Sequence, residues 1–438
     1  MKVAIAINWN LDASSLTNIA RHNFREIGKI MNETKSFTVA AIGIQSVGLG
    51  DFNQHYDLLH IPNMGGYKFA LNAASCCDNV IFGASGIDEI IYGKEILVWP
   101  GSWKQVKQSI ATEMLYWKKY SSKIKHIHLP ANSELEEFHK YLEIPYEKMS
   151  VIHHGVNHDF FKPSNNKEST RKKVLSKLKI PNAPYFLHIG EHNYVRKNLK
   201  RLGEAYEQAK YSQTPSKFKH NLIIAGKHYP AIEKELSRIG GIYFLDWISD
   251  DDLLQLVQGS DAFLLPSLHE GFGMPLVESM ACGVPSIACN LHAPPEVLSD
   301  SGLLVDAYSV DDIANSMIKL DQDKKLLQDL SKKSLIRGQY FSWKKNAEEI
   351  FKLYEIDSSK PMENFEKEYE LSAYRTLVSI ADMFPTPNVD LLGPLIRFNY
   401  LKLLDWVVNI GLKTSSTKDF LFPYADWYKL KFEELSKE

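Results

Sequence analysis

The sequence predicts an α/β protein with two doubly wound parallel sheets. Short apolar runs rich in β-branched residues alternate with stretches of helical spacing, first over residues 1–130 and again from residue 185. Strands that alternate with helices in this way form parallel sheets covered by helices. The length of 438 residues is sufficient for two domains, each with its own core.

The first run contains segments with the pattern of buried parallel strands. Each is short, apolar and rich in Val, Ile, Leu or Phe, which is typical of strands covered on both faces. They span residues 3–7, 37–44, 56–61, 79–83, 96–99 and 127–130, and residues 15–31 have helical spacing. Ligands of such sheets bind beyond the carboxyl ends of the strands, so the loops that follow these segments are candidate binding loops.

The second run repeats this arrangement after a polar, Lys-rich stretch at residues 164–179. Its predicted strands span residues 185–190, 222–226, 242–245, 262–265, 286–288 and 302–305, and its predicted helices include 311–320 and 324–337. A late helix is predicted from residue 343. These patterns divide the chain into a first domain (1–163), a second domain (164–342) and a final helix (343–356).

For residues 357–438, which follow this helix, the pattern predicts a helical C-terminal extension. Residues 369–381 and 395–412 have helical spacing, and a Pro-containing break separates them. The apolar content of this segment is too high for a disordered tail.

The composition argues against several classes of protein. The formal net charge of −2 gives no overall field that would favour nucleic acid, so no nucleic-acid partner is expected. Cys76, Cys77, Cys282 and Cys289 show no disulfide or metal-binding spacing, which favours a cytoplasmic compartment. The first residues do not resemble a signal peptide, and no run approaches the ~20 apolar residues of a membrane span. Peripheral contact with the inner face of a membrane stays open.

The segment from Leu268 to Glu278 carries the strongest functional pattern. Glu270 and Glu278 flank a Gly-Phe-Gly loop that leads from an apolar strand into a helix rich in small residues. Such a loop points backbone N–H groups and a helix N-terminus at an anion. The two glutamates can accept hydrogen bonds from hydroxyls on either side of that anion. A sugar joined to a nucleoside through a diphosphate has this layout.

This segment, completed by Gly283-Val284-Pro285, resembles the E-x7-E signature of retaining glycosyltransferases of family 4, the glycosyl transferases of group 1. The resemblance implies the GT-B fold, in which two Rossmann-like domains face each other across a cleft and a final helix, here 343–356, crosses back onto the first domain. It also implies retaining transfer of a hexose from a nucleotide diphosphate sugar to a glycan, lipid-linked or small-molecule acceptor, in glycan, polysaccharide or glycolipid synthesis. The nucleotide sugar would be a co-substrate, and no cofactor is expected.

The resemblance assigns donor-binding roles within this segment. Glu270 would lie against the hydroxyls of the donor sugar, and Glu278 would accept hydrogen bonds from the ribose diol. The other donor-binding residues belong to the loop and the first turn of the helix: Gly271, Phe272, Gly273, Met274 and Leu276. The loop would offer N–H groups to the sugar and the phosphates, and the two apolar side chains of the helix would pack near the nucleoside.

A second motif, which starts at Gly190, resembles the family's G-x-x-x-P-R-K-N-L loop. Lys197 would hold the diphosphate and stabilise the negative charge of the leaving nucleotide, and Arg196 would grip two oxygens at once. Glu191 stands where many relatives have an arginine, which leaves the diphosphate with one cation fewer. Weaker resemblances place further donor-binding residues after the next strands: Gly226, Lys227, Trp247 and Ile248. Core packing is an equal alternative for Trp247.

The first domain departs from the family pattern. Relatives often carry a histidine after the strand that corresponds to residues 96–99, and none stands there. His60, at the end of another strand, is a candidate substitute on the acceptor side, together with Asn63, Gly65 and Gly66. The alternative is that His60 is a structural histidine. No metal is expected, since basic side chains and a helix N-terminus take the role of the metal in GT-B enzymes.

Two other functions remain compatible with the pattern. The missing histidine and Glu191 favour a non-catalytic GT-B protein that binds a nucleotide sugar or a protein partner. Glu270, Glu278 and Lys197 are all present, which favours an enzyme. A sugar-nucleotide epimerase on the same fold would free a nucleotide without forming a glycoside, so a product assay separates it from a transferase.

Overall fold

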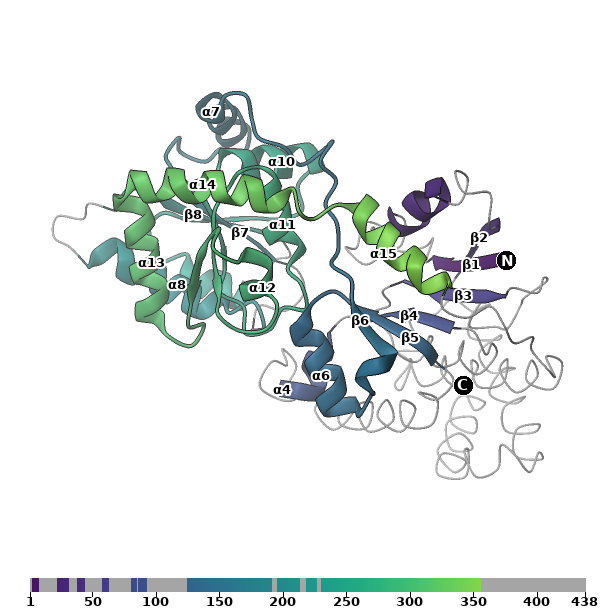
Figure 1. The fold of residues 1–438 in the computed structure, drawn as a ribbon. Helices are drawn as coiled ribbons and strands as arrows, with labels where there is room; N and C mark the ends of the chain where they lie inside the picture. The colour runs from purple at the N-terminus through teal and green to yellow at the C-terminus, as the bar shows by residue number, and fades with distance from the viewer. Residues whose placement is uncertain are drawn as a thin grey trace, which may run out of the picture.

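The protein is described by a computed structural model that covers residues 2–7, 22–30, 38–43, 57–62, 80–84, 86–92, 124–190, 195–212, 218–226 and 230–355. Within these residues the chain forms two six-stranded parallel sheets, one in each domain (Figure 1). The predicted α/β architecture with two doubly wound domains is therefore confirmed. The predicted strand 96–99 and the predicted helices of the C-terminal extension lie outside the described residues.

The first domain holds a sheet with the strand order β2-β1-β3-β4-β5-β6, in which neighbouring strands are parallel. Its strands are β1 (Lys2–Ile7), β2 (Thr38–Gly43), β3 (Leu58–Ile61), β4 (Val80–Gly83), β5 (Ile124–Leu129) and β6 (Met149–Val151). They are accompanied by a helix over residues 22–30, α4 (Asp88–Tyr92), α6 (Asn132–Leu142) and the short 3-10 turn η3 (Tyr146–Lys148). The short strand β6 was not predicted.

The second domain holds a sheet with the order β12-β11-β10-β7-β8-β9, again with parallel neighbours. Its strands are β7 (Tyr185–Gly190), β8 (Asn221–Gly226), β9 (Ile242–Leu245), β10 (Ala262–Leu265), β11 (Ser286–Cys289) and β12 (Leu303–Val305). Its helices are α7 (Lys167–Lys177), α8 (Leu199–Tyr211), α9 (Pro230–Leu236), α10 (Asp250–Gly259), α11 (Met274–Ala281), α12 (Pro294–Leu298), α13 (Val310–Gln322) and α14 (Lys324–Gly338). The strand order reverses between β7 and β10, so the loops after these two strands border the crevice where ligands bind.

Helices cover both faces of the second sheet, because side chains along each strand alternate between two cores. Phe186 and Leu264 pack in the core that α8 and α13 complete. Leu187 and Leu265 pack in the opposite core, which α10 and α11 complete. The continuous apolar runs in the sequence therefore reflect strands that are buried on both sides. The resulting three layers fix the carboxyl ends of β7 and β10 beside each other.

Two segments of the chain cross between the domains side by side (Figure 1). Val156, after β6, forms a parallel bridge with Ser342, just before α15 (Trp343–Glu355). Gly155 approaches the second segment so closely that a Cβ on it would lie 2.1 Å from the backbone nitrogen of Trp343. Glycine is required at residue 155 for this close approach.

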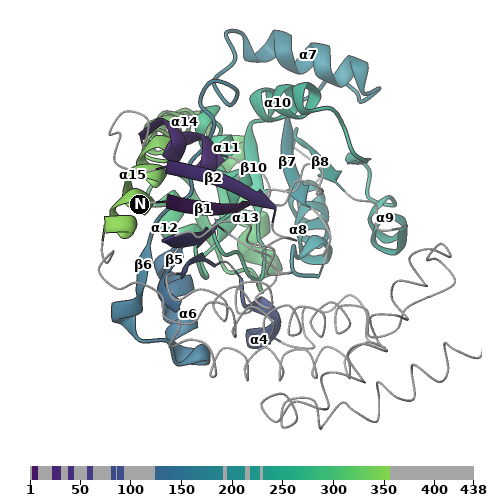
Figure 2. The same ribbon diagram turned by 90° about the vertical axis from the view of Figure 1, so that its right-hand side faces the viewer.

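The helix α15 returns to the first domain and lies beside the helix over residues 22–30 (Figures 1 and 2). Its residues Ala347 and Ile350 share a core with Val3 of β1 and Ile27. The ring of Trp343 stacks on that of His22 at 5.0 Å between centroids. The first domain is therefore built from both ends of the described chain.

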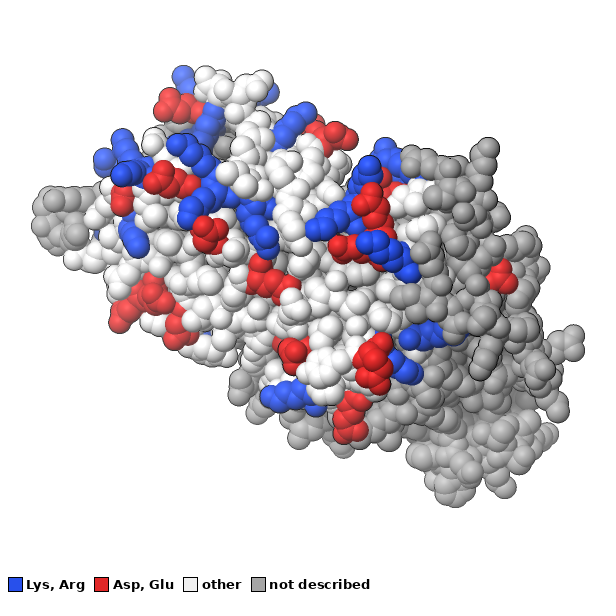
Figure 3. Space-filling model, in the orientation of Figure 1, with Lys and Arg blue, Asp and Glu red and all other residues white. Residues whose placement is uncertain are grey.

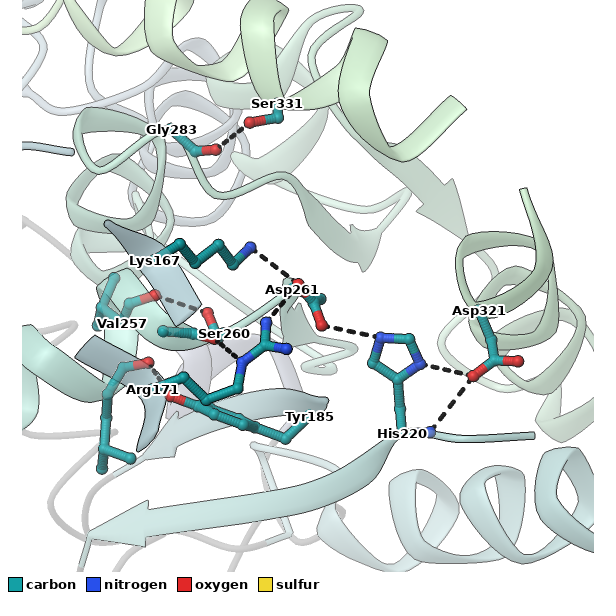
Figure 4. Close-up of polar contacts among 12 residues, drawn as sticks. Lys167, Arg171, Tyr185, His220, Val257, Ser260, Asp261, Gly283, Asp321 and Ser331 are labelled. Carbon is teal, nitrogen blue, oxygen red and sulfur yellow. Dashed lines mark hydrogen bonds and ion pairs between the residues drawn. The ribbon is translucent and has the colours of Figure 1, made fainter. Parts of the chain in front are cut away.

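A partly buried network of charged side chains lies at the amino ends of the strands of the second sheet (Figure 4). Asp261, which precedes β10, accepts hydrogen bonds from Arg171 at 2.6 Å and from Lys167 at 2.9 Å. Its other oxygen lies 3.1 Å from Nε2 of His220, whose Nδ1 lies 2.5 Å from Asp321. The network ties α7, β8, β10 and α13 together, opposite the edge of the sheet where ligands are expected.

The surface shows no large field of one sign on the face seen in Figure 3, where acidic and basic side chains are interspersed. This mixture agrees with the formal net charge of −2. Among the described residues, no helix is long and apolar enough to cross a membrane.

Candidate active site

Glu270 lies in the loop between β10 and α11, at the carboxyl edge of the second sheet. Gly273 is the N-cap of α11, and its φ of +88° is a left-handed conformation that favours glycine. Pro275 fits the first turn of α11, because proline lacks the N–H that this turn leaves unpaired. No described residue accepts from the backbone N–H groups of Phe272, Gly273 or Met274. These groups, at the positive end of the helix dipole, form an edge that can bind an anion.

Lys197 forms a buried ion pair with Glu270. It follows β7, and its Nζ lies 2.6 Å from Oε1 of Glu270 across the point where the strand order reverses. Burial alone would raise the pKa of the Glu270 carboxyl, but Lys197 and Arg196 hold that pKa at about 2. Burial also lowers the pKa of Lys197, and Glu270 opposes that effect. The pair thus places a fixed anion and a fixed cation beside the N–H groups of α11.

Arg196 links this pair to the first domain. Its Nη1 donates to the carbonyl of His269 at 3.1 Å and lies 3.7 Å from Oε2 of Glu270. Its Nε lies 3.5 Å from a carboxylate oxygen of Asp88 in α4. Both cations that were predicted to hold the diphosphate therefore contact Glu270. Arg196 also contacts Asp88 of the first domain.

Gly190 and Gly226 form a bare edge of backbone beside this cluster. They end β7 and β8 and are direct partners in the sheet. Gly226 has a φ of +137°, and a Cβ on it would lie 1.9 Å from the carbonyl oxygen of Gly190. Glycine is needed at residue 226 for both reasons. The edge leaves backbone accessible where a diphosphate is expected.

Trp247 and Glu278 lie on the predicted nucleoside side of the site. Trp247 follows β9, and its side chain is 58% exposed, so the alternative that it is only core packing is wrong. An exposed indole offers a flat apolar face to a base. Glu278, on α11, is half-buried; burial and then Asp250 raise the pKa of its carboxyl to about 7. Ile248 and Met274 are half-buried and pack against the core.

Two predicted contacts require correction. Leu276 is completely buried in the core of the second domain, so it supports α11 and does not reach a nucleoside. His60 is also completely buried: its Nε2 lies 2.9 Å from Nε2 of His128, and its Nδ1 lies 2.7 Å from the hydroxyl of Tyr354 in α15. Burial lowers the pKa of His60 to about 3, so it is a neutral structural histidine and not an acceptor-side residue. Lys227, Asn63, Gly65 and Gly66 lie outside the described residues.

The residues with which the first domain contacts the loop of Glu270 were not predicted. Gly271 faces Glu134 of α6, because a Cβ on Gly271 would lie 2.4 Å from Oε1 of Glu134. The other oxygen of Glu134 accepts the N–H of Gly86 at 2.7 Å, and burial raises the pKa of Glu134 to about 7. Glu296 of α12 forms a similar link, since it accepts two hydrogen bonds from Asn132.

The two-domain fold places the protein in the GT-B class. The structure is similar to that of a sucrose-phosphate synthase from Thermosynechococcus elongatus, with a TM-score of 0.64 and 15% identity over 81% of this chain and 98% of that chain. It is also similar to the Anabaena protein HepE in complex with UDP and glucose, with a TM-score of 0.61 and 16% identity over 81% of this chain and 99% of that chain.

Residues 154–336 match the family of glycosyl transferases group 1. The predicted family and its GT-B fold are thereby confirmed. Among curated relatives, an O-antigen chain mannosyltransferase B from Escherichia coli is 30% identical over 191 residues, which are 42% of this chain and 49% of the relative. The chain thus spans about half the length of that relative.

Proposed function

We propose that this protein is a retaining glycosyltransferase that moves a hexose, of the mannose class, from a nucleotide diphosphate sugar to a hydroxyl of a growing glycan. The observation that carries the proposal is the buried Lys197–Glu270 pair, next to N–H groups at the start of α11 for which the described part of the chain offers no acceptor. The name of the mannosyltransferase relative supports the choice of sugar and of a glycan acceptor.

The geometry suits the electrostatics of this reaction. Departure of a nucleoside diphosphate places negative charge on the leaving phosphate, and Lys197, Arg196 and the start of α11 supply positive charge around it. The Glu270 carboxylate can accept hydrogen bonds from the sugar hydroxyls. In the retaining mechanism implied by the family, the acceptor attacks from the face of the leaving group, and the leaving phosphate takes the proton of the acceptor hydroxyl.

Contacts between the domains support a reaction in a closed cleft. Arg196 reaches Asp88, and Gly271 meets Glu134, so the loop of the donor site is covered by the first domain. Exclusion of water from such a site limits hydrolysis of the donor. The proposal also allows an acceptor at a membrane surface, and the lipid-linked acceptors in the test below cover that case.

The test uses a panel of UDP-, GDP- and ADP-linked hexoses, including mannose, with the purified full chain. We expect one donor to raise the melting temperature and to release its nucleotide when glycan or lipid-linked acceptors are added. Nuclear magnetic resonance of the product should show the anomeric configuration of the donor. Thermal stabilisation without transfer to any acceptor would favour the non-catalytic alternative, and an inverted product would contradict retention.

We expect the affinity for a nucleotide sugar to rise as the pH passes from about 6 to about 8, around the raised pKa of Glu278. Below pH 7 the free carboxyl is mostly neutral, whereas the ribose diol donates more strongly to the ionised form. Calorimetric titration of the wild type and of Glu278→Gln measures the effect. The variant should show a flatter pH profile, and parallel profiles would remove Glu278 from the ribose site.

A further inference from the structure

A cluster of two histidines and one glutamate joins the domains one residue away from Glu270. Glu137 comes from α6 of the first domain. His269 precedes Glu270, and His292 lies between β11 and α12 of the second domain. The ligand atoms of these three side chains all lie within 4.8 Å of one another.

The distances within this cluster are close to those between ligands of one metal ion. Nε2 of His269 lies 3.1 and 3.3 Å from the two carboxylate oxygens of Glu137, and Nδ1 of His292 lies 2.7 Å from one of them. Ligand atoms around a tetrahedral zinc ion lie about 3.3 Å apart. The contact of 2.7 Å has the length of a hydrogen bond, and it would lengthen when a metal takes the place of the proton.

The charge of the cluster favours a cation. Glu137 is nearly buried, and among the described residues its ionic partners are the two histidines, with no Lys or Arg. A buried carboxylate of this kind needs a positive partner, which is either an imidazolium or a metal ion. Two neutral imidazoles and one carboxylate are a ligand set that zinc and related metals prefer.

The surroundings orient the ligands. Nε2 of His292 is hydrogen-bonded to the hydroxyl of Tyr92, which also reaches the carbonyl of Leu268 at 3.3 Å. Metal-binding histidines are usually held by such a bond from the second ring nitrogen. His292 has a φ of +59°, which is uncommon for a histidine and is held by its surroundings. The aromatic rings of Tyr92 and His269 also meet edge to face.

We propose that Glu137, His269 and His292 form a site for a divalent transition metal of the zinc class that bridges the two domains. The three side chains supply one ligand atom each, and the fourth position of a tetrahedral ion is left for water or another small ligand. The candidate site is empty here. Since its ligands come from both domains, a bound ion would stabilise the closed cleft. This proposal does not rest on sugar transfer.

The test is metal binding by the full chain after removal of adventitious metal with a chelator. Zinc affinity is measured by competition with a chromogenic chelator, and cobalt is used as a probe because its visible spectrum reports tetrahedral nitrogen and oxygen ligands. We expect each chain to bind one zinc ion at this site. His292→Asn and Glu137→Gln should each weaken it by at least about tenfold. Asparagine is chosen at residue 292 because it tolerates a positive φ.

The matched control is His153→Asn. His153 is a half-buried histidine that also joins the domains, through a contact of 2.6 Å with Glu296, but it lies outside the cluster. His153→Asn should leave the zinc affinity unchanged. This control separates the cluster from the other histidines of the chain. Circular dichroism checks that each variant is folded. If one cluster variant does not fold, the other still tests the site. Absence of stoichiometric binding, or binding that both cluster variants retain, would overturn the proposal and leave a hydrogen-bonded contact between the domains.

Discussion

Replacement of Glu270 by glutamine should reduce the rate of sugar transfer by about 10²–10³-fold, the usual effect of removing one preorganised electrostatic group from a transition state. As the bond to the phosphate breaks, the donor sugar gains positive charge near its anomeric carbon. Glu270 is held ionised by Lys197 and Arg196, because they keep its pKa at about 2. Glutamine retains the size of the side chain but removes the negative charge.

Glutamine is a better probe than alanine because the Lys197–Glu270 pair is buried. Removal of one partner from a buried ion pair costs about 3–5 kcal/mol, since the other charge is left without compensation. Lys197 can relieve that cost by releasing its proton, because burial already lowers its pKa. Alanine would leave Lys197 with no acceptor at this position, whereas the amide oxygen of glutamine can still accept its hydrogen bond.

The measurement compares initial rates and donor affinities of Glu270→Gln with those of Glu235→Gln, the same substitution at a surface glutamate that lies 3.8 Å from Lys200. The surface variant should transfer sugar at the wild-type rate. The main loss in Glu270→Gln should be in the catalytic rate, with a smaller loss of affinity for the donor. Wild-type transfer by Glu270→Gln would exclude Glu270 from the donor site.

The second domain was predictable because the patterns that specify its strands and its binding loop lie within short segments of the sequence. The apolar runs that became β7 and β10 are buried on both faces, so every residue in them signals a strand. The loop of Glu270 carries its own helix start in Gly273 and Pro275. Residues that lie at the ends of neighbouring parallel strands meet in space, and Lys197 and Glu270 meet for this reason.

The contacts between the domains were not predictable, because they depend on how two separately folded units meet. Glu137 is 155 residues from His292 in sequence, yet the two side chains touch. His60 shows the converse case: a histidine at a strand end suggests a site, but α15 returns from far along the chain and covers it. Leu276 belongs to the binding motif by position but faces the core, since the turn of the helix directs it inward.

The charged network of Asp261 should make a large polar contribution to the stability of the second domain. Burial alone would raise the pKa of Asp261, but His220, Lys167 and Arg171 hold it well below its usual range. The contribution of such a group is present above the unfolded-state pKa of about 3.9 and is lost as the pH falls toward the folded-state value. It is therefore fully present at neutral pH.

Asp261→Ala should lower the free energy of unfolding by about 3–5 kcal/mol at neutral pH, because it leaves Arg171, Lys167 and His220 without their shared anion. For a domain of this size the melting temperature should fall by about 6–20 °C. The matched control is Asp300→Ala, which removes an exposed carboxylate paired with Lys333 and should change the melting temperature little. Because Asp261 lies at the amino ends of the strands, Asp261→Ala should still bind the donor below its melting temperature. If the variant is as stable as the wild type, water solvates the three cations equally well without Asp261. The network would then contribute nothing to the free energy of unfolding.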